Sequence, residues 1–184
     1  MTNALPRLDR KNAALVVVDV QERLVPVMWN FAPVEKYCRA MILAARDLGL
    51  PVLATEQYPK GLGTTLGSIR EALGAAPIVK MHFSCGCDPV FMRALEATGK
   101  RQVIVVGIES HVCVFQTVRD LIGRGFEVFV CADAVTSRFE EHRRVALEQM
   151  RDLGAIVTSV ESIVFDLLQV CGTAEFKRVS KLLR

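Results

Sequence analysis

Residues 13–20 read AALVVVDV, a nearly continuous apolar run that is rich in β-branched valine. Such a run is typical of a strand that is buried on both faces, as in the middle of a parallel sheet. QVIVVGI at residues 102–108 is the next strongest run of this kind. Strands buried on both faces need a layer of helices on each side, so the sequence predicts an α/β fold.

Short apolar runs and amphipathic stretches alternate over the rest of the chain. Further strands are expected at 51–56, 77–84 and 126–133, helices at 33–49, 88–99, 111–125, 137–154 and 174–184, a strand running into a helix at 155–169, and a Gly- and Pro-rich loop at 57–68. We therefore predict one domain, residues 1–184, with a doubly wound parallel sheet of six strands in the order 3-2-1-4-5-6 and helices on both faces.

Composition limits the kind of partner. The chain has 184 residues, of which 51% are hydrophobic and 23% charged, so it is expected to bury one substantial core. Its net charge of +3 is too small to indicate nucleic acid, and the basic residues are spread along the chain. A mean hydropathy of +0.30 is high for a soluble monomer and predicts a homo-oligomer.

The sequence also predicts a compartment. No apolar run approaches the roughly 18 residues that a membrane-spanning helix needs, and the polar N-terminus resembles no signal peptide. The 6 cysteines are too dilute for a disulfide scaffold, and several lie in apolar segments. We expect a cytoplasmic protein that contacts neither membrane nor nucleic acid.

Chemically capable side chains follow the predicted strands. Asp19 and Gln21 come at the end of the first strand, Lys80 and Phe83 at the end of the third, and Cys113 shortly after the fourth. Ligands of open parallel sheets bind outside the carboxyl ends of the strands. We therefore expect these side chains to gather at one edge of the sheet.

An acid, a base and a thiol in one place favour nucleophilic catalysis. A thiol at the start of a helix and beside a cation has a lowered pKa, and a neighbouring carboxylate can accept its proton. Taken singly, each residue has a structural explanation: Asp19 ends a strand, Lys80 points to solvent, and Cys113 packs in the core. Their joint placement favours a catalytic role, with Cys113 as a nucleophile.

Three separated motifs carry a family resemblance. VVVDVQ at 16–21, IVK at 78–80 and GIESHVCVFQTVRDL at 107–121 resemble the isochorismatase-like cysteine hydrolases, and TEQYPKGLG at 55–63 and VESIVFDLLQ at 160–169 resemble the isochorismatase domain-containing subgroup. The resemblance implies catalytic roles for Asp19, Lys80 and Cys113. It further implies a cis peptide between Ile108 and Glu109 and an oxyanion hole made by the amides of Glu109 and Cys113.

By the same resemblance, the Cys113 thiolate attacks an amide-like carbon and water resolves the covalent intermediate. Asp19 relays protons, and Lys80 holds the charges together. We expect Gln21, Tyr58 and Phe83 to bind the substrate, which we take to be a small amide, imide or ester.

Differences between this sequence and the family's motifs argue against some of the family's reactions. Nicotinamidases of this superfamily hold a metal with an Asp and two His near the second strand, where this chain has Glu56, Gln57 and Tyr58. We therefore predict no metal and no cofactor. Cys113 also argues against the isochorismatases of siderophore pathways, which lack that thiol. His82 with Cys85 and Cys87 is only a weak metal motif, because no second cysteine pair follows at zinc-finger spacing.

Two other classes of protein stay open. One is a non-catalytic binding or scaffold protein in which the three residues persist as structure. The other is a ribonuclease, which the sequence supports poorly because it shows no paired histidines, no phosphate-binding loop and no concentrated basic groove.

Overall fold

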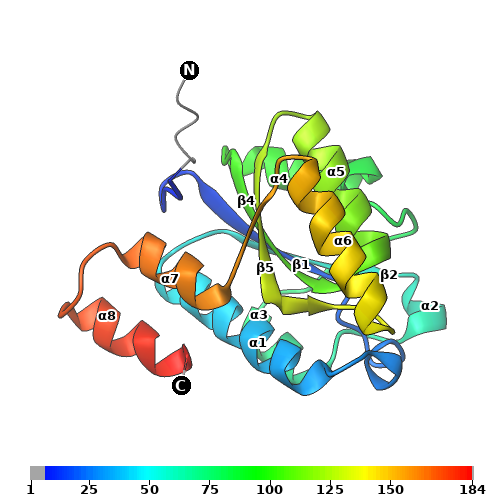
Figure 1. Ribbon diagram of the computed structural model, residues 1–184, viewed down its shortest axis with the longest axis horizontal. Coiled ribbons are helices and arrows are strands. Elements are labelled where there is room, and N and C mark those ends of the chain that lie inside the picture. The colour runs from blue at the N-terminus through cyan, green and yellow to red at the C-terminus, as the bar shows by residue number, and fades with distance from the viewer. Residues whose placement is uncertain (1–6, 184) are drawn as a thin grey trace.

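The computed structural model describes residues 7–183 (Figure 1). It contains one six-stranded sheet, in which every pairing is parallel, in the order β3-β2-β1-β4-β5-β6. The predicted fold class and strand order are confirmed. Residues 1–6, which belong to the N-terminus considered above, and Arg184, the last residue of the predicted C-terminal helix, lie outside the described residues.

The elements follow the expected alternation. The strands are β1 (Ala13–Val18), β2 (Val52–Gln57), β3 (Ile78–Lys80), β4 (Gln102–Ile108), β5 (Glu127–Thr136) and β6 (Ile156–Thr158). The α-helices are α1 (Phe31–Asp47), α2 (Pro59–Leu62), α3 (Gly67–Leu73), α4 (Pro89–Ala97), α5 (Phe115–Gly123), α6 (Glu140–Asp152), α7 (Val160–Leu168) and α8 (Ala174–Val179).

The two strands with the strongest apolar runs lie side by side at the centre of the sheet. Every residue of β1 and β4 is buried, and they pair from Ala13 with Gln102 to Val18 with Gly107. A Cβ on Gly107 would lie 2.1 Å from the carbonyl oxygen of Val18, and the φ of Gly107 is +120°. Only glycine allows this close approach, which sets the carboxyl ends of β1 and β4 against each other.

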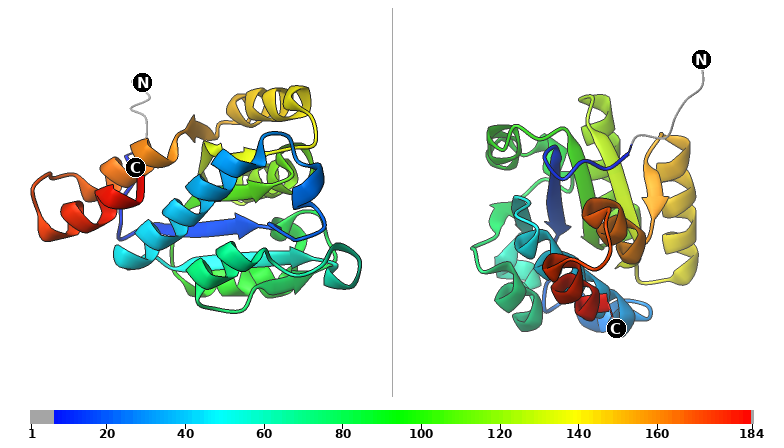
Figure 2. Two further views of the ribbon diagram at one scale, coloured as in Figure 1. Left: turned by 90° about the horizontal axis from the view of Figure 1, so that it is seen from below. Right: turned by 90° about the vertical axis from the view of Figure 1, so that its left-hand side faces the viewer.

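Helices cover both faces of the sheet, as predicted. Alternate β1 residues pack on opposite sides, so Leu15 and Val17 contact one apolar cluster and Val16 and Val18 the other. Residues of α1, α3, α7 and α8 complete the first cluster, and residues of α4, α5 and α6 complete the second. The two layers are visible in Figure 2, where helices flank the sheet on either side.

Some predicted boundaries are wrong. The third strand was expected to reach residue 84, but β3 ends at Lys80 because the chain then turns, and the carbonyls of His82 and Phe83 accept hydrogen bonds from the Lys80 ammonium. The first strand ends at Val18, since Asp19 has a φ of +48°. The fifth strand continues to Thr136, past a register shift opposite Val105 and Gly107.

Other predicted segments are divided. The loop expected at 57–68 contains the short helix α2 and the start of α3. The helix expected from residue 111 begins with a π-helical turn, Ser110–Val114, before α5. The C-terminal helix divides into α8 and the 3₁₀ segment Ser180–Leu183. Asp88 caps α4 as expected, by accepting hydrogen bonds from the amides of Val90 and Phe91.

Among residues 7–183, no helix combines the length and apolar character that crossing a bilayer requires.

Candidate active site

A buried ion pair stands at the carboxyl edge of the sheet. Asp19 directly follows β1, and Lys80 is the last residue of β3; both side chains are completely buried. The Lys80 Nζ lies 2.6 Å from the Asp19 Oδ2. The other carboxylate oxygen, Oδ1, accepts a hydrogen bond of 2.7 Å from the Thr55 hydroxyl on β2. The predicted convergence of the first and third strands is therefore present in the structure.

The Lys80 ammonium is surrounded by oxygen atoms. Besides Asp19, its Nζ lies within hydrogen-bond distance of the Gln57 Oε1 (2.8 Å) and of the carbonyls of Phe83 (3.0 Å) and His82 (3.1 Å). Gln57 reaches it because β2 and β3 pair Gln57 directly with Lys80. Burial is the largest single influence on the pKa of Lys80 and lowers it, but the charge and hydrogen bond of Asp19, together with the charges of Cys85 and Cys113, outweigh burial, so the net pKa is raised. Lys80 is thus a fixed, buried cation.

Cys113 lies in the π-helical turn that follows β4, and its side chain is almost fully buried. The prediction of a lowered thiol pKa is wrong. Burial and then the Asp19 charge raise the pKa of Cys113 far above its ordinary value, and the Lys80 charge opposes this only in part. The sequence argument counted the cation and the helix start and omitted desolvation. Cys113 is therefore a protonated thiol at rest, close enough to both charges for them to act on it.

A second buried thiol borders the same ion pair. The Cys85 Sγ lies 3.7 Å from the Thr55 hydroxyl, which is bonded to Asp19. Burial and then the Asp19 charge raise the pKa of Cys85 to about 11. Cys85 is buried, whereas Cys87, two residues later, is exposed. The Cys85 amide donates to the Thr117 hydroxyl on α5, which draws this segment inward.

The remaining cysteines lie away from the charged pair. Cys38 and Cys131 are buried in the core, and burial is the largest cause that raises the pKa of each thiol. Cys171 is exposed in the segment between α7 and α8.

The turn before Cys113 presents backbone groups beside the thiol. The peptide bond between Ile108 and Glu109 is cis, as the resemblance implied. The Glu109 carbonyl accepts hydrogen bonds of 3.1 Å from the amides of both Val112 and Val114, which closes the π-helical turn. Such turns recur at functional sites, because they shift the side chains and amides of one turn relative to a regular helix.

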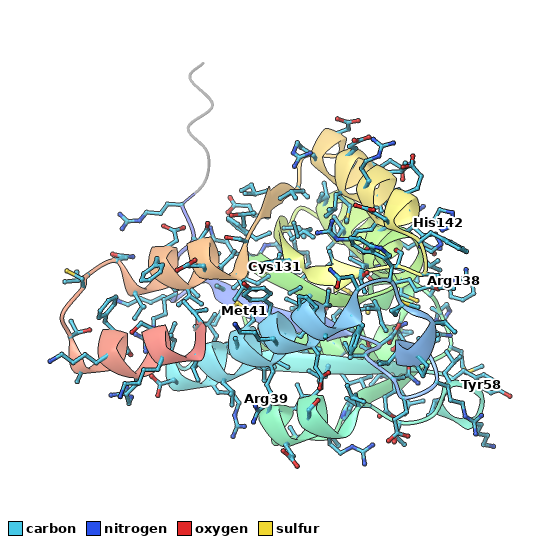
Figure 3. All side chains as sticks on the ribbon, turned by 60° about the horizontal axis from the view of Figure 1, so that its bottom comes forward. Arg39, Met41, Tyr58, Cys131, Arg138 and His142 are labelled. Carbon is cyan, nitrogen blue, oxygen red and sulfur yellow. The ribbon has the colours of Figure 1, made fainter. Side chains whose placement is uncertain are left out.

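The three residues expected to bind substrate differ in exposure. Gln21 is fully buried, and its side-chain amide bonds the backbone of Gln57 and the carbonyl of Gly63, so this amide is already engaged by the loop after β2. Tyr58 and Phe83 are exposed, and both border Lys80: the Tyr58 amide donates to the Lys80 carbonyl. Figure 3 shows Tyr58 at the same end of the molecule as Arg138 and His142.

Two histidines that lie far apart in the sequence are neighbours in the structure. His111, on the π-helical turn, and His142, on α6, have ring centroids 4.5 Å apart. The His111 Nδ1 lies 3.0 Å from the Ser137 hydroxyl. Burial lowers the pKa of His111, with further lowering by the charges of His142 and Arg138 against the opposing effect of Glu109.

The segment that corresponds to the metal ligands of nicotinamidases has another role here. The Glu56 Oε1 accepts hydrogen bonds from the amide and the hydroxyl of Thr65, which ties β2 to the start of α3. Within residues 7–183, no group of three or more His, Cys, Asp or Glu side chains could hold a metal ion.

Sequence reasoning missed Thr55 and Gln57, the β2 residues that bond Asp19 and Lys80. They are two residues apart on one strand and therefore face the same side of the sheet. Because β2 lies between β1 and β3, that side meets both charged residues. The period-two spacing was the available signal, and it became informative only with the strand order.

Fold and site together define a class: a doubly wound α/β protein with a buried carboxylate, ammonium and thiol at the carboxyl edge of its sheet. The chain belongs to the isochorismatase family, because the isochorismatase domain matches residues 13–162. It therefore has the isochorismatase-family hydrolase fold.

Relatives match over nearly the whole chain. The secreted isochorismatase effector Isc1 of Phytophthora sojae is 40% identical, over 100% of this chain and 90% of that protein. Isochorismatase domain-containing protein 2 of Danio rerio is 36% identical, over 96% of this chain and 89% of that protein.

Solved structures agree with the fold. The structure described as the MAR1 ribonuclease of Caenorhabditis elegans superposes with a TM-score of 0.91, at 41% identity, over 97% of this chain and 92% of that one. YcaC of Pseudomonas aeruginosa, described with a covalent acrylamide, has a TM-score of 0.92 at 26% identity, over 98% and 93%. YcaC of Escherichia coli, described as an octameric hydrolase of unknown specificity, superposes with a TM-score of 0.92 at 26% identity, over 98% of this chain and 92% of that one.

Proposed function

We propose that this chain is a metal-independent cysteine hydrolase that cleaves a small amide, imide or ester. The observation that carries the proposal is the buried pair of Asp19 and Lys80, whose charges act on the Cys113 thiol. Burying two charges is unfavourable unless they are paired and hydrogen-bonded, and such sites are retained where function uses them. The covalent acrylamide described in the similar YcaC structure is consistent with a reactive nucleophile in that protein.

The raised pKa of Cys113 determines how the reaction begins. Because the resting thiol is protonated, the carboxylate of Asp19 accepts the thiol proton as the sulfur attacks the carbonyl carbon. A tetrahedral intermediate forms, and we assign its oxyanion to the amides of Glu109 and Cys113. Lys80 holds the Asp19 carboxylate in position beforehand.

The second half of the reaction reverses the proton's path. When the intermediate collapses, the bond from carbon to the leaving nitrogen or oxygen breaks, and Asp19 returns the proton to the leaving group. An acyl group then remains on Cys113 as a thioester. Water, deprotonated by Asp19, attacks the thioester carbon, and the carboxylic acid and the Cys113 thiol are released.

A turnover assay with matched cysteine variants tests this proposal. The purified chain is assayed on a panel of small amides, imides and esters, with Cys113→Ser and Cys85→Ser in parallel. Both thiols are buried and border the same ion pair, so the two variants make similar demands on folding. We expect Cys113→Ser to lose turnover and Cys85→Ser to keep it. Turnover that survives in Cys113→Ser would refute the mechanism, and no turnover on any compound would favour the non-catalytic alternative.

RNA belongs in the same panel, because the Caenorhabditis elegans relative is described as a ribonuclease and His111 and His142 lie together here. We propose that nucleic acid is not a partner. The cation beside the two rings, Arg138, is already paired with Glu109 at 3.0 Å, and the net charge of the chain is only +3. RNA is therefore expected to stay intact.

The remaining proposals concern the setting of the enzyme. We propose that residues 1–184 act as one hydrolase domain and need no cofactor. The octameric Escherichia coli relative supports a homo-oligomer. All 6 cysteines carry free thiols, which supports a reducing compartment such as the cytoplasm, whereas the relative from Phytophthora sojae is described as secreted.

A further inference from the structure

Exposed aromatic side chains gather where the strands end. Trp29 follows β1, Tyr58 follows β2, Phe83 follows β3 and Phe139 follows β5, while Cys113 follows β4. Aromatic side chains are normally among the more buried residues, so exposed ones that share one edge call for an explanation. We call Trp29, Tyr58, Phe83 and Phe139 the aromatic rim. Among residues 7–183, the other strongly exposed aromatic side chain is Phe165, on α7.

One half of the rim is attached to Lys80. The Phe83 carbonyl accepts a hydrogen bond of 3.0 Å from the Lys80 ammonium. The Tyr58 amide donates to the Lys80 carbonyl over 3.1 Å. The backbone of each of these two aromatic residues is thus fixed by the same buried residue that pairs with Asp19, while 46% of Tyr58 and 55% of Phe83 remain exposed.

The other half is attached to the turn that carries Cys113. Phe139 meets His142 edge to face with centroids 5.2 Å apart. The His142 ring lies 4.5 Å from that of His111, tilted by 42°, and His111 stands two residues before Cys113. The Ser137 hydroxyl bonds His111, and the Ser137 carbonyl accepts a hydrogen bond of 2.9 Å from the Trp29 amide. In Figure 3, His142 and Arg138, which neighbour Phe139 in this half, lie at the same end of the molecule as Tyr58, which belongs to the first half.

Three cations near the rim are already engaged. Lys80 is paired with Asp19, Arg138 is paired with Glu109, and the Arg23 guanidinium donates to the Gly61 carbonyl over 2.9 Å. Lys60, on α2, is exposed to solvent. Because water screens the charge of an exposed ammonium, Lys60 offers a carboxylate little. A substrate carboxylate bound between the rim and Cys113 would therefore lose its hydration without gaining a buried cation that is free to pair with it.

We infer that the aromatic rim binds a flat, apolar part of an uncharged substrate while the scissile carbonyl reaches Cys113. This inference rests on the proposed function and specifies its substrate class: an uncharged amide or ester that bears an aromatic or similarly flat group. Aromatic faces offer such a group area and stacking geometry that a carboxylate cannot use. The four aromatic residues come from four separate loops that follow β1, β2, β3 and β5.

Three alkylating reagents that share the same reactive group, an iodomethyl carbon beside a carbonyl, test the inference. Iodoacetamide, iodoacetate and N-benzyl-iodoacetamide are each reacted with the folded protein, and labelling is followed at each cysteine by peptide mass spectrometry. The exposed thiol of Cys171 supplies the intrinsic reactivity of each reagent, so rates at Cys113 are expressed relative to it. Variants Phe83→Ala and Phe139→Ala probe the two halves of the rim. Phe165→Ala is the matched control, since it removes an exposed aromatic ring elsewhere.

We expect the normalised rate at Cys113 to be about tenfold higher for the benzyl reagent than for iodoacetamide, and lower for iodoacetate. Phe83→Ala and Phe139→Ala should bring the ratio of benzyl to plain reagent toward one, and Phe165→Ala should leave it unchanged. A wild-type ratio near one, or iodoacetate as fast as the benzyl reagent, overturns the inference while leaving Cys113 as the nucleophile.

Two further outcomes also overturn it. If Phe83→Ala and Phe139→Ala change the mass of the assembly in light scattering and leave the reagent ratio intact, the rim is an interface between copies of the chain. If none of the reagents labels Cys113 while Cys87 and Cys171 react, the proposed function itself fails.

Discussion

At the scale of single residues, the site depends on two opposite charges that lie entirely inside the protein. Asp19 and Lys80 satisfy each other at 2.6 Å, with Thr55 and Gln57 as further partners. Either charge alone would be buried without compensation. The catalytic proposal therefore has a thermodynamic counterpart that can be measured without any substrate.

The first prediction is a double-mutant cycle on this pair. Asp19→Asn and Lys80→Met should each lower the free energy of unfolding by about 3–5 kcal/mol, because each leaves one buried charge unpaired. The double variant should lose clearly less than the sum, since it buries no charge. Urea unfolding curves measure all four proteins. Losses that simply add would show that the two charges do not depend on each other.

The second prediction concerns the pH dependence of Cys113 alkylation. Burial and the Asp19 charge raise the pKa of Cys113, so the thiolate fraction keeps growing as pH rises. The alkylation rate of Cys113 should therefore continue to increase above pH ~10, where an ordinary thiol with a pKa of ~8.5 is almost fully ionised. Asp19→Asn removes the negative charge and should shift the profile to lower pH. A plateau of the alkylation rate at neutral pH in the wild-type protein would contradict this prediction and would support the lowered pKa that was expected from the sequence alone.

At the scale of the elements, the carboxyl end of β4 must lie against β1 for the site to form. Gly107 permits this, because a Cβ there would meet the Val18 carbonyl at 2.1 Å. Gly107→Ala should lower the free energy of unfolding by about 2–4 kcal/mol, from the positive φ and the clash together.

Gly123→Ala is the control for this third prediction. Gly123 ends α5, has no left-handed φ, and its added Cβ would have no atom within 4 Å. Its unfolding free energy should change by no more than about 1 kcal/mol, toward greater stability. Equal effects of the two alanines in chemical unfolding would contradict the packing argument.

Element order and strand order were predictable because they depend on hydrophobic periodicity and on the handedness of crossovers. Boundaries beside the site were not. β3 stops at Lys80 because a buried ammonium takes up the following carbonyls, and the π-helical turn before α5 leaves no mark in apolar spacing. Asp19, Lys80 and Cys113 were found as candidates from strand ends. The direction of the Cys113 pKa shift could not be predicted from the sequence, because burial is a property of the packed molecule.

At the scale of the whole molecule, apolar surface remains after the sheet is covered. Besides the aromatic rim, the edge strand β3 and the residue that follows it expose Val79 and Met81. Exposed apolar side chains on an edge strand are typical of a surface that another chain covers. The octameric Escherichia coli relative shares this fold with a TM-score of 0.92.

The fourth prediction is therefore a closed homo-oligomer. Light scattering coupled to size exclusion should return a multiple of 20.3 kDa at micromolar concentration. Met81→Glu should reduce that mass by placing a charge on the exposed strand edge, and Leu153→Glu, at another exposed apolar position, serves as the control. A wild-type particle of monomer mass would contradict the prediction.

The central claim is that Cys113 carries the acyl group during turnover, and mass spectrometry of the protein quenched while it hydrolyses an activated ester tests it most directly. With p-nitrophenyl acetate as substrate, the account predicts one acetyl group per chain, mapped to Cys113. The group should be present in Cys85→Ser and absent in Cys113→Ser and Asp19→Asn. An acetyl group mapped to Cys85 or to a lysine, or turnover without any adduct in a rapidly quenched sample, would contradict it.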